Sequence, residues 1–392
     1  MFRLKGLSPE GDATLVLATP GGLALEPFHF ALLAPFSRRP PVTLAELGRR
    51  NGLAVDWSGE GQRVHCFSQL VACKLEQRDN TAPNEAAGAL ADKLGAALPP
   101  DPLGFGPPPQ PAAGGAAPEG LVLRVVIEAR SAAWRSIKNV ADILRACDEA
   151  NAKGFAVGPF KGIQCRLLPR GLDAAPQPAG PLGSNSPGVQ ALYQAIGAVR
   201  SAHLFVAAVG SSGAHAFFMK PDQSGGAGFL ELRPCGWGST HAGEADGGKD
   251  AMMAQLQRGG DAIRFFAYNL EDPAQCSPPD YQPALRAALD SKAPMPWQTP
   301  QAAHQLQGKP PPRYSPDQLM ARDQHLTPKP GALLAMIRHA AGLLADKGAY
   351  TAARSASRLH GYGVPQGVWL GPQGLTDAPQ KAQAGGQELL PA

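Results

Sequence analysis

The sequence lacks long apolar runs. No stretch of its 392 residues approaches the roughly 18 consecutive apolar residues that a membrane-spanning helix needs. The first 22 residues, MFRLKGLSPEGDATLVLATPGG, hold no apolar core long enough for a cleaved signal peptide. We therefore expect no membrane span. The location is expected to be cytoplasmic in the producing cell, or outside it by a secretion route that needs no cleaved signal peptide.

Cysteine is scarce and scattered. The six cysteines lie at positions 66, 73, 147, 165, 235 and 276, and none forms a Cys-x-x-Cys pair. This number in so long a chain does not make the disulfide framework of a small secreted domain, so we expect most of them to be reduced. The spacing does not suit zinc either, because structural zinc sites use closely paired ligands. The sequence predicts no metal and no cofactor.

Net charge and aromatic residues are also low. The net charge is +4, and Phe, Trp and Tyr together make up 6% of the residues. Proteins that bind single-stranded nucleic acid combine basic grooves with aromatic side chains that stack on bases. The run GPFKGIQCRLLPRG at 158–171 has basic residues but a single aromatic one. We therefore expect no nucleic-acid partner, and a protein substrate or partner protein instead.

Glycine and proline, in contrast, are abundant and clustered. The chain has 46 glycines and 40 prolines. The tract LPPDPLGFGPPPQPAAGGAAPEG at 98–120 suits neither a helix nor a strand ladder, so we expect a flexible insert there and a second loop at 169–188. These tracts suggest an N-terminal accessory segment at 1–44, a main domain at 45–271 and a C-terminal region at 272–392.

Apolar residues recur with helical spacing in some segments and cluster in short runs in others. Helices are expected at 43–51, from 64 onward, and at 84–98, 135–154, 189–202, 249–258 and 331–347. Strands are expected at 121–129, 203–210, 214–221 and 228–234, and the apolar run 263–270 completes this core.

The three consecutive strands between 203 and 234 are joined by the short segments SSG and DQSGGA. Gly-rich connections of this length are typical of hairpins, so the sequence predicts an antiparallel β-meander. The fold class expected is α+β, with a helical half at about 45–160, a meander half at about 190–270 and a cleft between them. The long Pro/Gly-rich segments are expected to be disordered.

Cys66 stands where the helix expected from 64 begins. A cysteine at a helix N-terminus faces unpaired backbone N–H groups and the positive end of the helix dipole, and both favour the thiolate. Gln62, four residues upstream, is placed to offer its amide to an oxyanion beside this nucleophile. The alternative is that Cys66 is simply a small buried residue, as free cysteines often are.

His215 follows Cys66 by 149 residues and opens the second strand of the expected meander. If that strand pairs across the next turn, His215 faces Arg233 and shares a sheet face with Glu231. A carboxylate there would hold the tautomer of the imidazole, the third role in a nucleophile–base–orienter triad. A slip of one residue would turn Glu231 away and leave Asp222 as the acid. The alternative is a histidine without a chemical task.

This order of residues resembles that of the papain-like cysteine proteases, which separate cysteine and histidine by about 130–150 residues. In detail, VHCFSQLVACKL around Cys66 and GAHAFF around His215 are similar to the YopT-type cysteine proteases, effectors that bacteria inject into host cells. The resemblance implies a papain-like domain at 45–271 in which Cys66 attacks a carbonyl and His215 accepts the thiol proton. In FLELRPCGWG it offers Glu231 as the acid, while Arg233 and a proline stand where the family has Asp-Pro.

A non-enzymatic role is the alternative that the sequence leaves open. Pro-rich segments that link small docking modules would suit a structural or adaptor component of a bacterial secretion system or phage particle. A transglutaminase- or deamidase-like enzyme would use the same triad as a protease. Geometry separates the classes, because an enzyme needs the Cys66 sulfur close to a ring nitrogen of His215.

Overall fold

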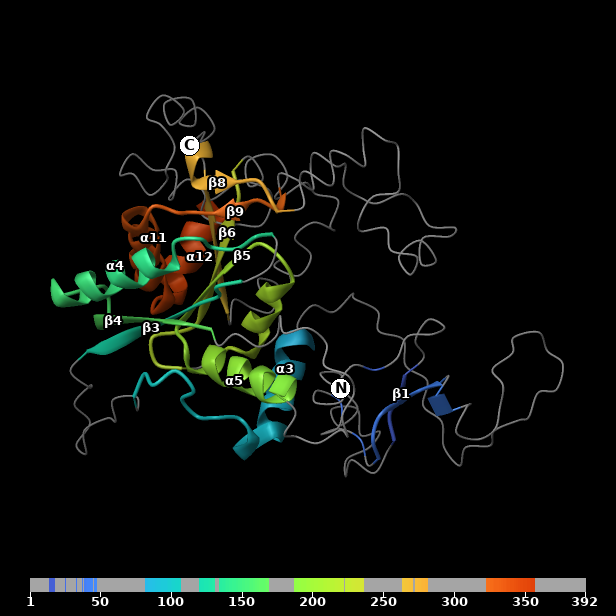
Figure 1. Cartoon of the computed structure of the whole chain (residues 1–392). Coiled ribbons are helices and arrows are strands. Elements are labelled where there is room, and N and C mark those ends of the chain that lie inside the picture. The colour runs from blue at the N-terminus through green and yellow to red at the C-terminus, as the bar shows by residue number, and fades with distance from the viewer. Residues whose placement is uncertain are drawn as a thin grey trace, which may run out of the picture.

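Figure 1 shows the computed structural model of the chain, which describes its central sheet, the helices around it and a few short outlying pieces. The described residues are 82–106, 120–130, 134–168, 187–221, 223–235, 263–270, 272–280 and 322–356, with short pieces between 14 and 47.

Five parallel strands form the centre of the molecule. They are β3 (Leu121–Ile127), β4 (Phe160–Leu167), β5 (Leu204–Ala208), β6 (Gly228–Arg233) and β7 (Arg264–Asn269). Their order across the sheet is β4-β3-β5-β6-β7, and every neighbouring pair is parallel. The strands read as nearly continuous apolar runs because both faces of a parallel sheet are covered.

Helices cover both faces of this sheet (Figure 1). On one face lie α4 (Val140–Ala152), α11 (Pro330–Leu344) and α12 (Lys347–Ala356). On the other lie α3 (Ala82–Leu94) with its extension η2 (Gly95–Ala97), α5 (Pro187–Ser201) and the 3₁₀ helix η3 (Ser211–Phe218). Numbered along the chain, the strand order is 2-1-3-4-5, the order of flavodoxin-like doubly wound sheets.

Two core clusters hold these layers together. The larger joins the sheet to α4, α11 and α12, and Leu333, Met336 and Ile337 of α11 are fully buried in it. The smaller lies between α3 and α5, where Leu90 and Leu94 contact residues such as Ile196. The C-terminal region expected at 272–392 therefore contributes α11 and α12 to the main core.

Small strand pairs complete the described structure. β1 (Val16–Leu17) pairs in parallel with β2 (Val42–Thr43). β8 (Cys276–Ser277), which follows η4 (Pro273–Gln275), pairs antiparallel with β9 (His325–Leu326). The backbone N–H of Glu46 donates to the hydroxyl of Thr43 at 3.0 Å, as expected for the helix cap at 43–51.

The mixture of helices and strands is confirmed, but the antiparallel meander is wrong. β5 and β6 run parallel, and the segment expected as the strand 214–221 contains most of η3. The register expected to place His215 opposite Arg233 therefore does not exist. The prediction of hairpins failed because the segment SSG begins a 3₁₀ helix that lies over the sheet face. In addition, the apolar runs are strands buried on both faces, as in a parallel sheet.

The expectation that most cysteines are reduced is also wrong. Cys147 of α4 is bonded to Cys165 of β4, and Cys235 after β6 is bonded to Cys276 of β8. Their Cα atoms are 6.1 Å apart in each pair, although 18 and 41 residues separate them in the chain. Spacing in the sequence did not reveal these pairs, because the packing of separate elements brings them together.

Several other expected elements are present, and some lie outside the described residues. The structure confirms the expected helices near 84–98, 135–154, 189–202 and 331–347, and the expected strands near 121, 203, 228 and 263. Strand β4 was not predicted. Two expected helices, from 64 onward and at 249–258, lie outside the described residues. So do most of the expected loops at 98–120 and 169–188. Within the described part of the chain, no helix combines the length and apolarity needed to cross a membrane.

Candidate functional site

The carboxyl edge of the sheet contains a topological switch point between β3 and β5. The chain leaves β3 towards α4 on one face and leaves β5 towards η3 on the opposite face. In open parallel sheets such a divergence leaves a crevice outside the strand ends, where ligands bind. We refer to the region between residues 128–130 and 134–136 after β3 and residues 209–213 after β5 as the crevice.

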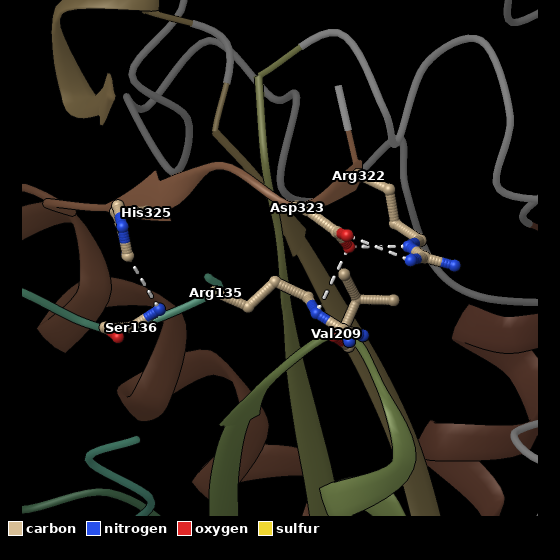
Figure 2. A network of polar contacts seen from close by, with 6 residues as sticks. All are labelled: Arg135, Ser136, Val209, Arg322, Asp323 and His325. Carbon is tan, nitrogen blue, oxygen red and sulfur yellow. Dashed lines mark hydrogen bonds and ion pairs between the residues drawn. The ribbon is translucent and has the colours of Figure 1, made fainter. Parts of the chain in front are cut away.

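Arg135 spans this switch point (Figure 2). Its Nη1 donates to the backbone carbonyl of Val209 at 3.0 Å, and its Nε lies 3.3 Å from a carboxylate oxygen of Asp323. Its φ of 54° is the single positive value among the described residues other than glycine. A strained backbone of this kind is held only where the surroundings determine it, and it is frequent at functional sites.

Asp323 is shared between two arginines. Arg322 donates from Nε and Nη2 to the two oxygens of Asp323 at 2.7 and 3.0 Å. The Asp323 side chain is only 8% exposed. Its backbone carbonyl also accepts from the N–H of Arg135 at 3.2 Å, so segment 322–326 is bound to the loop after β3.

Further bonds keep this segment in place. The backbone N–H of Ser136 donates to Nδ1 of the buried His325, which leaves the ring proton on Nε2 for Asp280 at 3.1 Å. Leu326 is bound to Ser136 by its N–H. Arg135 and Ser136 are therefore held by backbone and side-chain bonds to segment 322–326.

Gly210 brings a second arginine to the same place. A Cβ at this glycine would collide with Nη1 of Arg135 and lie 3.4 Å from Nη1 of Arg130. The two guanidinium groups therefore converge on the first residues after β5. Nε and Nη1 of Arg130 are buried and have no hydrogen-bond partner among the described residues. A buried donor without a partner costs about 1–3 kcal/mol, more when it is charged, so a ligand that accepts these N–H groups would be favoured.

The turn Gly210-Ser211-Ser212-Gly213 adds neutral donors. It leads from β5 into η3, and the N–H of Gly213 closes the turn on the carbonyl of Gly210 at 3.1 Å. Ser212 is only 6% exposed, and its hydroxyl has no partner among the described residues. The first N–H groups of a helix are not used within the helix, and they attract anions.

The charges around the crevice are unequal. Arg130, Arg135 and Arg322 bring three guanidinium groups to it, whereas Asp323 and Glu128 bring two carboxylates. Nε of Arg135 is ion-paired with Asp323, whereas Nε and Nη1 of Arg130 are buried without a hydrogen-bond partner among the described residues. The arrangement therefore suits an oxyanion of modest size.

His215 lies on η3, over the sheet face that carries Phe205. Its Nδ1 is 2.9 Å from the carbonyl oxygen of Ser212, and its ring meets that of Phe205 edge-on at 6.3 Å. A carbonyl oxygen only accepts, so Nδ1 carries the proton when the ring is neutral. The lone pair is then on Nε2, the state that a general base requires.

Glu231 is buried in the middle of β6. It lies beside Ala207 and Ala267 of the neighbouring strands, and Nε of Arg233 donates to its carboxylate at 2.8 Å. Both side chains of the pair are at most 2% exposed. Glu231 is therefore ion-paired with Arg233, and Nδ1 of His215 contacts the Ser212 carbonyl. Cys66, Gln62 and Asp222 lie outside the described residues.

The crevice was not anticipated from the sequence. Arg130, Arg135, Gly210 and Ser212 were not chosen as candidates. The available signal was an apolar strand followed directly by Gly-Ser-Ser-Gly, with a second strand followed by an arginine-containing loop. The described residues contain no group of three or more His, Cys, Asp or Glu placed to hold a metal ion.

Comparison of the chain with protein-family models finds no match, and comparison with curated proteins also finds none. The geometry of the site therefore carries the functional argument.

Proposed function

We propose that the protein binds a small anionic ligand in the crevice between β3 and β5, with Arg130 as the main charged contact. The observation that carries this proposal is the buried pair of N–H groups on Arg130, which have no partner among the described residues. Arg135 and the turn that starts at Gly210 stand beside them. The location agrees with the rule that ligands occupy the switch point of an open parallel sheet.

The proposal is tested by titrating inorganic phosphate into the full chain in a calorimeter, at low and at moderate salt. Replacing Arg130 by Gln removes the charge but keeps a polar side chain. One hydrogen bond from a charged group contributes about 1.5–3 kcal/mol, so Arg130→Gln should weaken binding roughly ten- to hundredfold.

The matched control is Arg145→Gln. Arg145 lies on the exposed side of α4, where its side chain is 65% exposed and paired with Asp142. This change should leave phosphate affinity unaltered. The proposal is refuted if the unaltered chain binds no phosphate, or if the Arg130 and Arg145 variants bind it equally well.

We propose a thiol-dependent hydrolase acting on protein substrates as the second candidate function. The tautomer of His215 favours it, because the Ser212 carbonyl leaves Nε2 as the basic nitrogen. Cys66 would be the nucleophile and Gln62 the oxyanion donor, with Glu231 or Asp222 as a supporting acid. Under this candidate function, the two halves of the protein would be arranged as in papain. The protein would be related to the YopT-type proteases and delivered as a secreted bacterial effector.

The second candidate is tested by the rate of iodoacetamide labelling of Cys66 against pH, read by peptide mass spectrometry. Fast labelling below pH 7 that is lost in His215→Ala would indicate a thiolate–imidazolium pair. Cys73 serves as the internal comparison. If Cys66 labels no faster than Cys73, the hydrolase candidate fails and a structural or adaptor role in a secretion system or phage particle becomes the better account.

A further inference from the structure

The two disulfides differ in how far solvent reaches them. Cys147 and Cys165 are 1% and 3% exposed in the core between α4 and β4. Cys235 and Cys276, which join the end of β6 to β8, are both partly exposed. Thiol–disulfide exchange requires that an attacking thiolate reach a sulfur atom of the bond. The Cys235–Cys276 bond is therefore the more accessible of the two to a reductant.

The two sulfur atoms of this bond have different surroundings. The backbone N–H of Cys235 lies 3.0 Å from Sγ of Cys276, and a hydrogen bond of this kind stabilises a thiolate at that sulfur. Sγ of Cys235 lies 3.2 Å from the carbonyl oxygen of Asp272, which accepts from a thiol but disfavours a thiolate. In exchange, the sulfur with the more stable thiolate leaves faster. An attacking thiolate should therefore bond to Cys235 and expel Cys276.

The bond also holds a short segment made of η4 and β8. β8 pairs through two residues with β9, and a two-stranded ladder of this length is not stable alone. The carbonyl of Gln275 accepts from the N–H of Thr327 at 2.7 Å, and its Oε1 accepts from the N–H of Lys329 at 2.8 Å. The ion pair of Lys329 with Asp272 is exposed, so it adds little. The covalent link to β6 is therefore a main support of this segment.

Segment 322–329 lies between β8 and the loop before α4. The N–H of Leu326 donates to the carbonyl of Ser136 at 2.9 Å, and the side chain of Asn139 donates to the carbonyl of Pro328 at 2.8 Å. Leu326 is fully buried, so these contacts should persist when β8 moves away. Release of β8 would then remove one of the two sets of bonds that hold segment 322–329.

We propose that Cys235–Cys276 is a site of exchange with a dithiol reductant, and that its reduction releases η4 and β8 from the end of β6. A thiolate of the dithiol attacks Sγ of Cys235, the S–S bond breaks, and Cys276 leaves as a thiolate. The second thiol of the reductant then attacks the reductant's own sulfur in the mixed disulfide, and Cys235 leaves. Two electrons pass to the cysteines, which end as thiols after protonation, while the dithiol becomes a disulfide. No ligand of the crevice takes part in this exchange.

The chemical step is tested by adding dithiothreitol to the full chain without denaturant and labelling the freed thiols with iodoacetamide. Peptide mass spectrometry should show Cys235 and Cys276 labelled at least about tenfold faster than Cys147 and Cys165. With glutathione in place of the dithiol, and iodoacetamide to block the freed sulfur, the mixed disulfide should form on Cys235. Equal labelling of the two pairs overturns the proposed site, and glutathione mainly on Cys276 overturns the direction of attack.

The structural step is tested by hydrogen exchange of the oxidised and the reduced chain, read by mass spectrometry. Peptides from 272–280 should exchange at least about tenfold faster after reduction, those from 322–329 by a smaller factor, and those from 121–127 at an unchanged rate. A variant with Cys147→Ala and Cys165→Ala is the control and should respond to the dithiol in the same way. Unchanged exchange of 272–280 overturns the release. Loss of protection in 121–127 means that reduction unfolds the sheet, and it overturns a local release as well.

Discussion

At the scale of single residues, the sheet contains a buried ion pair of Glu231 and Arg233. Both are buried on β6 between apolar strands, 2.8 Å apart. Two charges removed from water are tolerated there because they are paired with each other, and Arg233 also lies over the ring of Phe265. Losing one partner of this pair should therefore lower the free energy of unfolding more than losing both.

Glu231→Gln should lower the free energy of unfolding by about 3–5 kcal/mol, because it removes the negative charge that lies 2.8 Å from the buried guanidinium of Arg233. Urea unfolding followed by circular dichroism measures the loss. The double change Glu231→Leu with Arg233→Met should cost less than the single one. Asp142→Asn, which breaks an exposed pair with Arg145, is the control and should cost under about 1 kcal/mol. Equal losses in Glu231→Gln and the control would contradict the prediction.

His203 should make stability depend on pH. Its Nδ1 accepts from the N–H of Arg124 and its Nε2 donates to the carbonyl of Ser224, each at 3.0 Å. Burial, aided by the charge of Arg124 and opposed by the bond to Ser224, lowers the pKa of His203 from 6.5 to about 4. The unfolded chain therefore binds the proton first, and stability should fall as the pH drops from about 6.5 to about 4.

The expected loss from this histidine is about 3 kcal/mol, and it is complete below about pH 4. The measurement is the free energy of unfolding at a series of pH values for the unaltered chain and for His203→Gln. The glutamine keeps a donor and an acceptor but does not titrate in this window. If both proteins lose stability in parallel between pH 6.5 and 4, the histidine is not the cause.

At the scale of elements, the disulfides tie helices and small strands to the sheet. One bond joins α4 to β4, and the other joins the end of β6 to β8. Closing loops of 18 and 41 residues should stabilise the fold by about 3 and 4 kcal/mol through the entropy of the unfolded chain. Such bonds persist in oxidising compartments.

Peptide mapping after alkylation without prior reduction should therefore find Cys147, Cys165, Cys235 and Cys276 unlabelled. Replacing Cys235 and Cys276 together by Ser should lower the unfolding free energy more than replacing Cys147 and Cys165 by Ala, because the longer loop is released. Free thiols at all four positions in protein purified without reductant would contradict this.

Two glycines differ in whether the backbone requires a glycine at their position. Gly226 has a φ of +80°, and a Cβ there would collide with the backbone carbonyl of Leu344 at the end of α11. Gly226→Ala should cost at least about 2 kcal/mol from strain and lost packing. Gly88 in α3 has nothing within 4 Å of a Cβ, so Gly88→Ala should stabilise the chain by about 0.5–1 kcal/mol. Thermal unfolding distinguishes them, and the same sign for both would contradict the account.

At the scale of the whole molecule, helices α11 and α12 near the end of the described chain complete the core of the sheet domain. α11 covers the sheet beside α4, and its residues Leu333, Met336, Ile337 and Leu344 are fully buried. Tyr350 of α12 bonds both the N–H and the carbonyl of Phe265 in β7. The last described elements are therefore structural parts of the sheet domain.

A chain that ends at residue 321 should fail to fold cooperatively. Each large apolar side chain on α11 contributes about 1.5–3 kcal/mol by burial, and together they rival the whole net stability of a domain, about 5–15 kcal/mol. The expected result is loss of a cooperative thermal transition and binding of a hydrophobic dye. A chain that ends at 356 keeps every described element and is the control. An intact transition in the shorter chain would contradict this role for α11.

The sequence by itself determined where α4, α5 and α11 and the strands β3, β5, β6 and β7 form. Their signals are local, namely an apolar stripe at helical spacing or a short run of β-branched and aromatic residues, and each can be read within a dozen residues. The chemistry proposed for Cys66 and His215 rested on the same kind of local reading, and its test stays open.

Only the tertiary structure decided the direction of the strands, the disulfide pairs and the crevice. Parallel or antiparallel pairing depends on where a connection crosses the sheet, which a short Gly-Ser segment does not encode. Arg135 and Val209 are 74 residues apart, and Arg130 meets Gly210 across a similar distance in the chain. Their convergence follows from the packing of α4 and η3 on opposite faces, a non-local result that no spacing in the sequence displays.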